Sequence, residues 1–300
     1  MSDRPAGGFV SRDGVRLHVL RWESAGPALV LVPGLGQSAH VFRELAPALA
    51  GDFRVIAFTP RGHGQSATPT GDYTLEGFAD DLRAVLDGLQ VERAIVVAHS
   101  LGGTVATRLA VRSPGRVRGI VYLDALHDYG RWGEVMMRNP FPPPPRPDFG
   151  DRDATRAWMT RYVPGFWCDA LEADLKAHAW TDMASWRSEL VMGLLDDATV
   201  HPTPYAQLRC PALALVAAES LRTQFGWLQP MEGADRERAE AYLRTVREPW
   251  RRASEARFVR EAPGARVVRI DGGHYFFLTA RDRVAAEIRA FASSLTPLDT

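Results

Sequence analysis

Cysteine, net charge and long apolar runs are all scarce in this 300-residue sequence. The two cysteines, Cys168 and Cys210, are far apart and show no metal-ligand spacing, which argues against a disulfide scaffold and a zinc site. Acidic and basic residues balance at 36 each, so no net field attracts nucleic acid or an anionic membrane surface. The composition therefore predicts a neutral or mildly polar small-molecule substrate and no nucleic-acid partner.

Segments typical of membrane or export signals are also lacking. No apolar run approaches the roughly 20 residues that span a bilayer. Residues 1–8 are polar and lack the charged and then apolar pattern of a secretory signal. We expect a cytoplasmic protein without membrane insertion, and the sequence leaves open whether it forms a homodimer.

What the sequence does contain is an alternation of strand-like and helix-like segments. Asp13-Gly14 separates two short alternating runs, residues 9–12 and 15–22, which is a strong hairpin signal. Nearly continuous apolar runs, typical of buried parallel strands, follow at 28–32, 54–58, 94–98, 117–124, 212–217 and 267–270. Helical spacing occurs at 40–50, 75–89, 101–112 and 280–294. Because strands and helices alternate along the chain, we predict an α/β protein with a mostly parallel sheet.

Two stretches interrupt this alternation. The gap between residues 124 and 212 is too long for a loop, and it contains many large apolar side chains. We predict a helical cap at 127–206, with a core formed by 1–126 and 207–300. Residues 221–262 are rich in charge and are predicted to be a helical insertion within that core.

A serine lies at the junction of the predicted strand 94–98 and the predicted helix 101–112. In Ala98-His99-Ser100-Leu101-Gly102 the small residues two before and two after the serine would permit a sharp turn with the hydroxyl exposed. Ala98 stands where glycine is commoner, and a serine could also simply cap the helix. The strand-turn-helix placement favours a nucleophile at Ser100.

A serine nucleophile needs a base, and His274 is the candidate. Histidine suits proton transfer because it titrates near neutral pH. His274 follows the last predicted strand after two glycines, which places it at the carboxyl edge of the sheet, on the same side as Ser100. His99 and His63 are interpreted as structural residues.

Three motifs together resemble the α/β-hydrolase superfamily, in particular its bacterial esterase-like members. They are Pro33-Gly34-Leu35-Gly36, Arg61-Gly62-His63-Gly64-Gln65-Ser66 and the turn from Ala98 to Gly103. The resemblance implies a mostly parallel eight-stranded sheet flanked by helices, with an inserted helical cap. It also implies a carboxylesterase-like serine hydrolase without metal or cofactor, in which the Leu35 and Leu101 N–H groups hold the oxyanion.

The acid that completes the triad has two candidates. The superfamily commonly places an aspartate after the seventh strand, but this sequence has Ala217-Ala218-Glu219-Ser220 there. Some relatives carry the acid directly after the sixth strand, and Asp124 occupies that position. Asp124 is preferred, and Glu219 stays the alternative.

The substrate and the rival functions complete the predictions. Trp132, Met136 and Phe141, close after the sixth strand, are predicted to line an apolar pocket for small to medium esters. The same fold can also act as a cofactor-free lyase, a perhydrolase or a ligand receptor. Relatives that displace halide or open epoxides are disfavoured, because they need a carboxylate at position 100.

A rival of another class is an NADP-dependent oxidoreductase. Residues 34–39 fit the pattern G-x-G-x-x-A, and Arg61 follows the next strand. Against this interpretation, Pro33 precedes the first glycine, and Ser100 and His274 would have no role.

Overall fold

A single eight-stranded sheet organises the computed structural model, which describes residues 4–69, 73–141, 151–162, 172, 188–262 and 264–295. The strand order is β1-β2-β4-β3-β5-β6-β7-β8. The strands are β1 Ala6–Arg12, β2 Val15–Trp22, β3 Ala28–Val32, β4 Arg54–Phe58, β5 Ala94–His99, β6 Val117–Leu123, β7 Ala212–Ala218 and β8 Arg266–Asp271. Strands β1, β2 and β4 pair antiparallel and all other pairs are parallel, as the sequence predicts.

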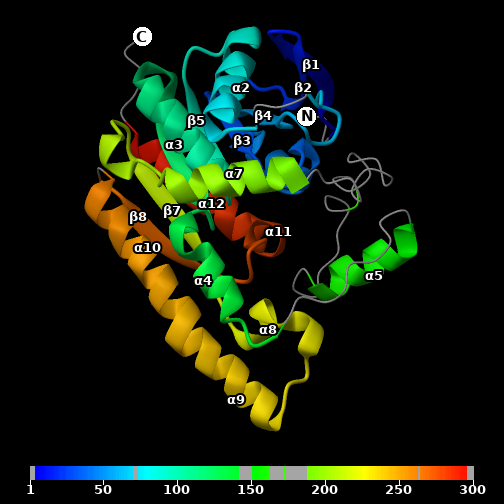
Figure 1. Cartoon of the computed structure of the whole chain (residues 1–300). Coiled ribbons are helices and arrows are strands. Elements are labelled where there is room, and N and C mark those ends of the chain that lie inside the picture. Colours follow the sequence, from blue (N-terminus) through cyan, green and yellow to red (C-terminus); the bar gives the residue numbers. More distant parts are fainter. Residues whose placement is uncertain are drawn as a thin grey trace.

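Helices of the described residues lie on both faces of this sheet (Figure 1). The described α-helices are α1 Leu45–Leu49, α2 Leu75–Gly88, α3 Gly102–Arg112, α4 Trp132–Met137, α5 Arg152–Tyr162, α7 Ser188–Val200, α8 Leu221–Gln224, α9 Gly233–Tyr242, α10 Glu248–Glu261, α11 Phe276–Thr279 and α12 Arg281–Ser294. Short turns are η1 Ala39–Phe42, η2 Pro114–Arg116, η3 Tyr129–Arg131, η4 Tyr205–Gln207, η5 Gly226–Leu228 and the π-helical η6 Leu243–Arg247.

Two apolar clusters sandwich the sheet. Helices α2, α3 and α7 cover one face, and Phe258 of α10 joins them there. Elements η1, α1, α11 and α12 cover the other face. The central strands are therefore buried on both sides, which explains their continuous apolar sequences.

The predicted hairpin and one predicted helix show how individual residues determine turns and helix breaks. Asp13 and Gly14 both have positive φ, 49° and 80°, as a two-residue hairpin turn requires. The predicted helix 40–50 is instead divided into η1 and α1. Pro47 has no N–H to bond the carbonyl of Arg43, so one continuous helix cannot run through this segment.

The predicted cap and the predicted charged insertion share a third apolar cluster. Val135 of α4 and Phe141 pack with Phe225, Tyr242 and Trp250 of the second insertion. The Tyr242 hydroxyl donates to the Val135 carbonyl at 3.0 Å, and α9 and α10 form a long rod beside α4 (Figure 1). The second insertion therefore has an apolar side as well as the charged surface that its sequence predicts.

Part of the predicted cap, including residues 142–150, 163–171 and 173–187, lies outside the described residues. Within the described part, α7 is fixed to the core, because Asp197 Oδ2 accepts the Leu75 N–H at 2.7 Å at the start of α2. Among the described helices, none has the length and apolarity to cross a bilayer.

Candidate active site

Ser100 occupies a strained turn between β5 and α3. Its φ is +52°, a conformation that is uncommon for a residue with a side chain. The Ser100 N–H donates to Leu123 O of β6 at 3.1 Å, and Ser100 O accepts the Gly103 N–H at 2.9 Å. Bonds to the neighbouring strand β6 and to the first turn of α3 hold the strained backbone, which is typical of a functional turn.

Glycines allow the neighbouring loop to approach this turn closely. A Cβ on Gly102 would lie 2.5 Å from Pro33 O, and a Cβ on Gly34 would lie 2.9 Å from Ser100 Cβ. The first turn of α3 therefore packs directly on the loop after β3. Side chains at these two positions would separate the serine from that loop.

His274 and Asp124 are brought into direct contact across 150 residues of sequence. His274 Nδ1 donates to Asp124 Oδ2 at 2.7 Å. Asp124 follows β6 with φ +44° and is 2 % exposed, whereas the His274 side chain is 36 % exposed. The carboxylate therefore fixes one ring nitrogen and leaves the opposite nitrogen for other partners.

Glu219, the alternative acid, is committed elsewhere. Both of its carboxylate oxygens pair with the guanidinium of Arg247, and Arg251 Nη1 lies 3.2 Å from Oε1. No contact between Glu219 and His274 is found among the described residues. The geometry thus selects Asp124 as the partner of His274.

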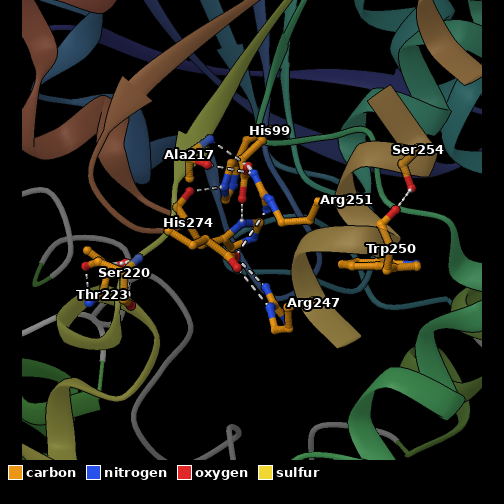
Figure 2. Close-up of polar contacts among 11 residues, drawn as sticks. His99, Ala217, Ser220, Thr223, Arg247, Trp250, Arg251, Ser254 and His274 are labelled. Carbon is orange, nitrogen blue, oxygen red and sulfur yellow. Dashed lines mark hydrogen bonds and ion pairs between the residues drawn. The ribbon is translucent and has the colours of Figure 1, made fainter. Parts of the chain in front are cut away.

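The second oxygen of Asp124 is held by two donors. Oδ1 accepts the Ala217 N–H at 3.0 Å and Arg251 Nη2 at 2.7 Å. Figure 2 shows Arg251 extending from its helix toward Ala217 and the neighbourhood of His274. Burial opposes ionisation, but Arg251 and His274 outweigh it and hold the pKa of Asp124 well below its usual value. Asp124 is a carboxylate at neutral pH.

In the loop after β3, the Leu35 N–H lies between two N–H groups that already form hydrogen bonds. The Gly34 N–H donates to Gln37 Oε1 at 2.8 Å, and the Gly36 N–H donates to His63 Nε2 at 3.0 Å. The Leu35 N–H and the Leu101 N–H take part in none of the hydrogen bonds found in the described part of the chain. Both amides are thus free to bind an oxyanion.

His63, interpreted from sequence as structural, supports this loop. Its Nδ1–H donates to Arg61 O at 2.9 Å, which leaves Nε2 as the acceptor for Gly36. Arg61 in turn forms a buried bidentate pair with Asp81 of α2, with both contacts at 2.6 Å. The Arg61–Ser66 motif therefore anchors the loop after β3.

His99 connects the serine turn to the histidine loop. Its Nε2 lies 3.0 Å from His274 O and its Nδ1 lies 2.9 Å from Gln37 Oε1, so a neutral ring donates to one of these two oxygens. Burial, followed by the neighbouring His274, lowers the pKa of His99 well below its usual value. A neutral, fully enclosed His99 fits the structural role predicted for it.

An aromatic wall stands beside His274, and only part of it is predicted from sequence. The His127 ring stacks on His274 with centroids 5.4 Å apart and on Trp250 at 5.3 Å, and Trp132 lies 5.8 Å from His127. His127, Trp250 and Tyr129 were missed because nothing local distinguishes them, although His127 and Tyr129 come three and five residues after Asp124.

The other predicted pocket residues lie differently. Phe141 is buried against Phe225 in the cluster shared by the two insertions, at a ring distance of 5.5 Å. Met136 is 37 % exposed on α4. Among the described residues, no hydrogen bond or ring contact joins either of them to Ser100, Asp124 or His274, whereas Trp132 lies 5.8 Å from His127, which stacks on His274.

Ligand atoms of Asp124, His127 and His274 lie within 4.8 Å of one another. Both Asp124 oxygens are nevertheless engaged by His274, Ala217 and Arg251. A guanidinium in contact with the carboxylate also repels a cation. This cluster fits an acid–base pair better than a metal site.

The glycines of the rival dinucleotide motif have other functions. Gly34 and Gly36 belong to the loop against Ser100, and the short η1 follows them in place of a long helix. A long helix start is what the pyrophosphate of a dinucleotide requires. The structure thus gives the oxidoreductase interpretation no support.

Comparisons with known proteins agree with this geometry. A family model described as alpha/beta hydrolase fold matches residues 27–163. A fluoroacetate dehalogenase from a Burkholderia species is 28% identical over 223 residues, covering 66% of this chain and 73% of the dehalogenase. A 2-heptyl-3-hydroxy-4-quinolone dioxygenase, AqdC2, from Rhodococcus erythropolis is 43% identical over 105 residues, 34% of this chain and 39% of that enzyme.

A solved structure matches almost the whole chain. The crystal structure of E-2-(acetamidomethylene)succinate hydrolase superposes with a TM-score of 0.70 at 21% sequence identity, covering 97% of this chain and all of that one. At this identity the match concerns the fold. Taken with the strand order, these matches show that the chain has the alpha/beta hydrolase fold, and that residues 27–163 match the family model of that fold.

Proposed function

We propose that this enzyme is a serine hydrolase that cleaves an ester-like bond of a small to medium, largely apolar substrate through an acyl-enzyme intermediate. The observation that carries the proposal is the contact of His274 Nδ1 with Asp124 Oδ2 at 2.7 Å, with His274 O 3.0 Å from the ring of His99, the residue before the strained Ser100. An aspartate that holds one imidazole nitrogen leaves the other to act as a base on the serine.

The proposed reaction has two halves. His274 takes the Ser100 proton as the serine oxygen attacks the carbonyl carbon, and the Leu35 and Leu101 N–H groups bind the oxyanion. Collapse of the resulting tetrahedral intermediate breaks the bond to the leaving group, which receives the proton from His274. A water then repeats the sequence on the acyl-enzyme and releases the acid, restoring Ser100.

The aromatic wall supports an apolar substrate. Trp132 and Trp250 lie 5.5 Å apart and border His127, which stacks on His274. Such surfaces favour apolar groups near the reacting carbon. The fluoroacetate dehalogenase is similar in sequence, but dehalogenation of that kind would need a carboxylate at position 100, and this chain has serine there.

Covalent labelling tests the proposal directly. A fluorophosphonate probe should label the wild-type protein at Ser100 and should not label Ser100→Ala. Equal labelling of both proteins, or no labelling of the wild type, would contradict the proposal. A panel of p-nitrophenyl esters from acetate to decanoate then measures the preferred acyl length, and a burst of p-nitrophenol reports the acyl-enzyme.

The remaining alternatives are outcomes of the same assays. A perhydrolase would form peracid from an ester and hydrogen peroxide, and a receptor would bind esters without turnover. A cofactor-free lyase would leave Ser100 unlabelled by substrate during turnover, whereas the proposed hydrolase forms an acylated Ser100 that is detectable by mass spectrometry. Tight NADPH binding without esterase activity would support the oxidoreductase.

A further inference from the structure

Tyr129 is a buried residue of η3 next to the candidate triad. It lies five residues after Asp124, and its side chain packs near His127 and Trp132 at ring distances of 6.1 and 6.5 Å. Thr199 of α7 donates to Tyr129 O at 3.2 Å, which fixes its backbone against the cap. The residue is 8 % exposed, so its position is determined by packing.

The hydroxyl of Tyr129 is the unusual part of this side chain. It is buried and has no hydrogen-bond partner in the described part of the chain. Burial raises the pKa of Tyr129, and the neighbouring Ser100 hydroxyl opposes that change. The Tyr129 ring lies 6.1 Å from that of His127, which stacks on His274 at 5.4 Å, so this hydroxyl is buried next to the candidate triad.

An unpaired buried hydroxyl has a cost that calls for a reason. Leaving such a group unsatisfied costs about 1–3 kcal/mol, and most buried polar groups in proteins are paired. An unpaired hydroxyl that is buried next to the candidate triad would gain a partner when a substrate binds there.

The order of the strands indicates which substrate atom that partner is. Ser100 follows β5, which lies between β3 and β6. The Leu35 amide follows β3, whereas Tyr129 and Asp124 both follow β6. Tyr129 therefore belongs to the β6 side of the site, with Asp124 and its partner His274, whereas Leu35 belongs to the β3 side.

On the proposed hydrolase mechanism, His274 protonates the leaving group, so the leaving-group oxygen lies on this side. We propose that the Tyr129 hydroxyl donates a hydrogen bond to the leaving-group oxygen and stabilises its developing negative charge. The carbon–oxygen bond breaks, His274 delivers the proton, and Tyr129 keeps its own proton throughout. The inference rests on the proposed function and adds a second donor at the leaving group.

The test compares esters that share an acetyl group and differ in the acidity of the alcohol. A poor leaving group such as an alkyl alcohol needs stabilisation, whereas p-nitrophenolate needs little. For Tyr129→Phe we expect kcat/KM to fall about 10–100-fold with the alkyl ester and less than about threefold with the p-nitrophenyl ester. Equal losses with both esters, or no loss with either, would overturn the proposal.

Tyr205→Phe is the matched control. Tyr205 is also a buried tyrosine, 2 % exposed, but it packs in the core against Tyr122 and Phe258. For Tyr205→Phe, kcat/KM should change by the same factor with both esters. The phenylalanine at position 129 removes a hydroxyl without a protein partner, so the thermal midpoint should be maintained, and Tyr129→Leu repeats the comparison if it is not.

Fluorophosphonate labelling separates this proposal from the one on which it rests. If Tyr129→Phe is labelled at Ser100 as the wild type is, and the leaving-group dependence is unchanged, the serine hydrolase assignment holds and the role of Tyr129 is wrong. If the wild type itself is not labelled, both are wrong.

Discussion

Arg251 and Asp124 form an ion pair of 2.7 Å on the side of the carboxylate that faces away from His274. Both side chains are at least nine-tenths buried, and Arg251 Nη2 also donates to Ala217 O at 3.0 Å. The cation comes from α10 of the second insertion, so this insertion acts directly on the candidate triad (Figure 2).

Neutralising Arg251 should move the pH dependence of activity. Without the cation the pKa of Asp124 rises, because Arg251 is the main group that lowers it. For Arg251→Gln we expect the acidic limb of the kcat/KM profile to move to higher pH by roughly one unit. A pH profile with an uncharged ester measures this shift.

Two further substitutions serve as controls. Arg251→Lys keeps a cation and should restore most of the wild-type profile. Arg252→Gln removes an exposed cation of the same helix, 70% exposed and paired with Glu248, and should leave the profile unchanged. A profile for Arg251→Gln that superposes on the wild type would show that Arg251 has only a packing role.

Substituting the two candidate acids should give very different losses. Asp124→Asn removes the acceptor of the His274 Nδ1–H and should lower kcat by about 10⁴-fold. Glu219→Gln should stay within about tenfold of wild type, since its partners are Arg247 and Arg251. Steady-state kinetics with circular dichroism as a folding check makes the comparison, and the reverse order would move the acid to Glu219.

Stability should depend on pH through His127. Burial, with smaller effects of the neighbouring charges, lowers the pKa of His127 to about 3 from the usual 6.5. Between these values the unfolded chain binds a proton that the folded protein does not, so stability falls as the pH is lowered from about 6.5. His127→Phe should reduce the slope of the unfolding free energy between pH 4 and 6 by about 1.4 kcal/mol per pH unit.

Urea unfolding at several pH values measures this slope. His201→Gln is the control, since the His201 side chain is 63% exposed, and its slope should stay close to that of the wild type. A slope for His127→Phe equal to the wild-type slope would mean that His127 is protonated in the folded protein.

A methyl group at the start of α3 should separate the serine turn from the loop after β3. Gly102→Ala would place a Cβ 2.5 Å from Pro33 O, which is backbone and cannot rotate away. We expect a loss of about 1–3 kcal/mol in unfolding free energy and a marked loss of fluorophosphonate labelling. Gly115→Ala meets no atom within 4 Å and should change neither quantity.

Local sequence accounts for the elements that carry this site. The central strands β3, β4, β5 and β6 are predicted within a residue or so, because burial on both faces of a parallel sheet requires continuous apolar runs. The turn at Ser100 is predicted because a strand, a serine and glycines are adjacent in sequence. Position along the chain also indicates His274, since residues after parallel strands meet at one edge of the sheet.

Local patterns alone therefore predict the α/β architecture, the hairpin at Asp13-Gly14 and the candidate residues Ser100 and His274. Contacts between distant parts of the chain show that Asp124 rather than Glu219 contacts His274, that Arg251 binds the other oxygen of that carboxylate, and that Tyr129 lies beside His127. The two kinds of feature differ in the sequence distance over which their interactions act. Backbone periodicity and turn chemistry act over a few residues, whereas the Asp124–Arg251 contact joins residues 127 positions apart. Charge pairing at that separation depends on how helices α9 and α10 pack on the predicted cap. A short stretch of sequence therefore cannot predict it.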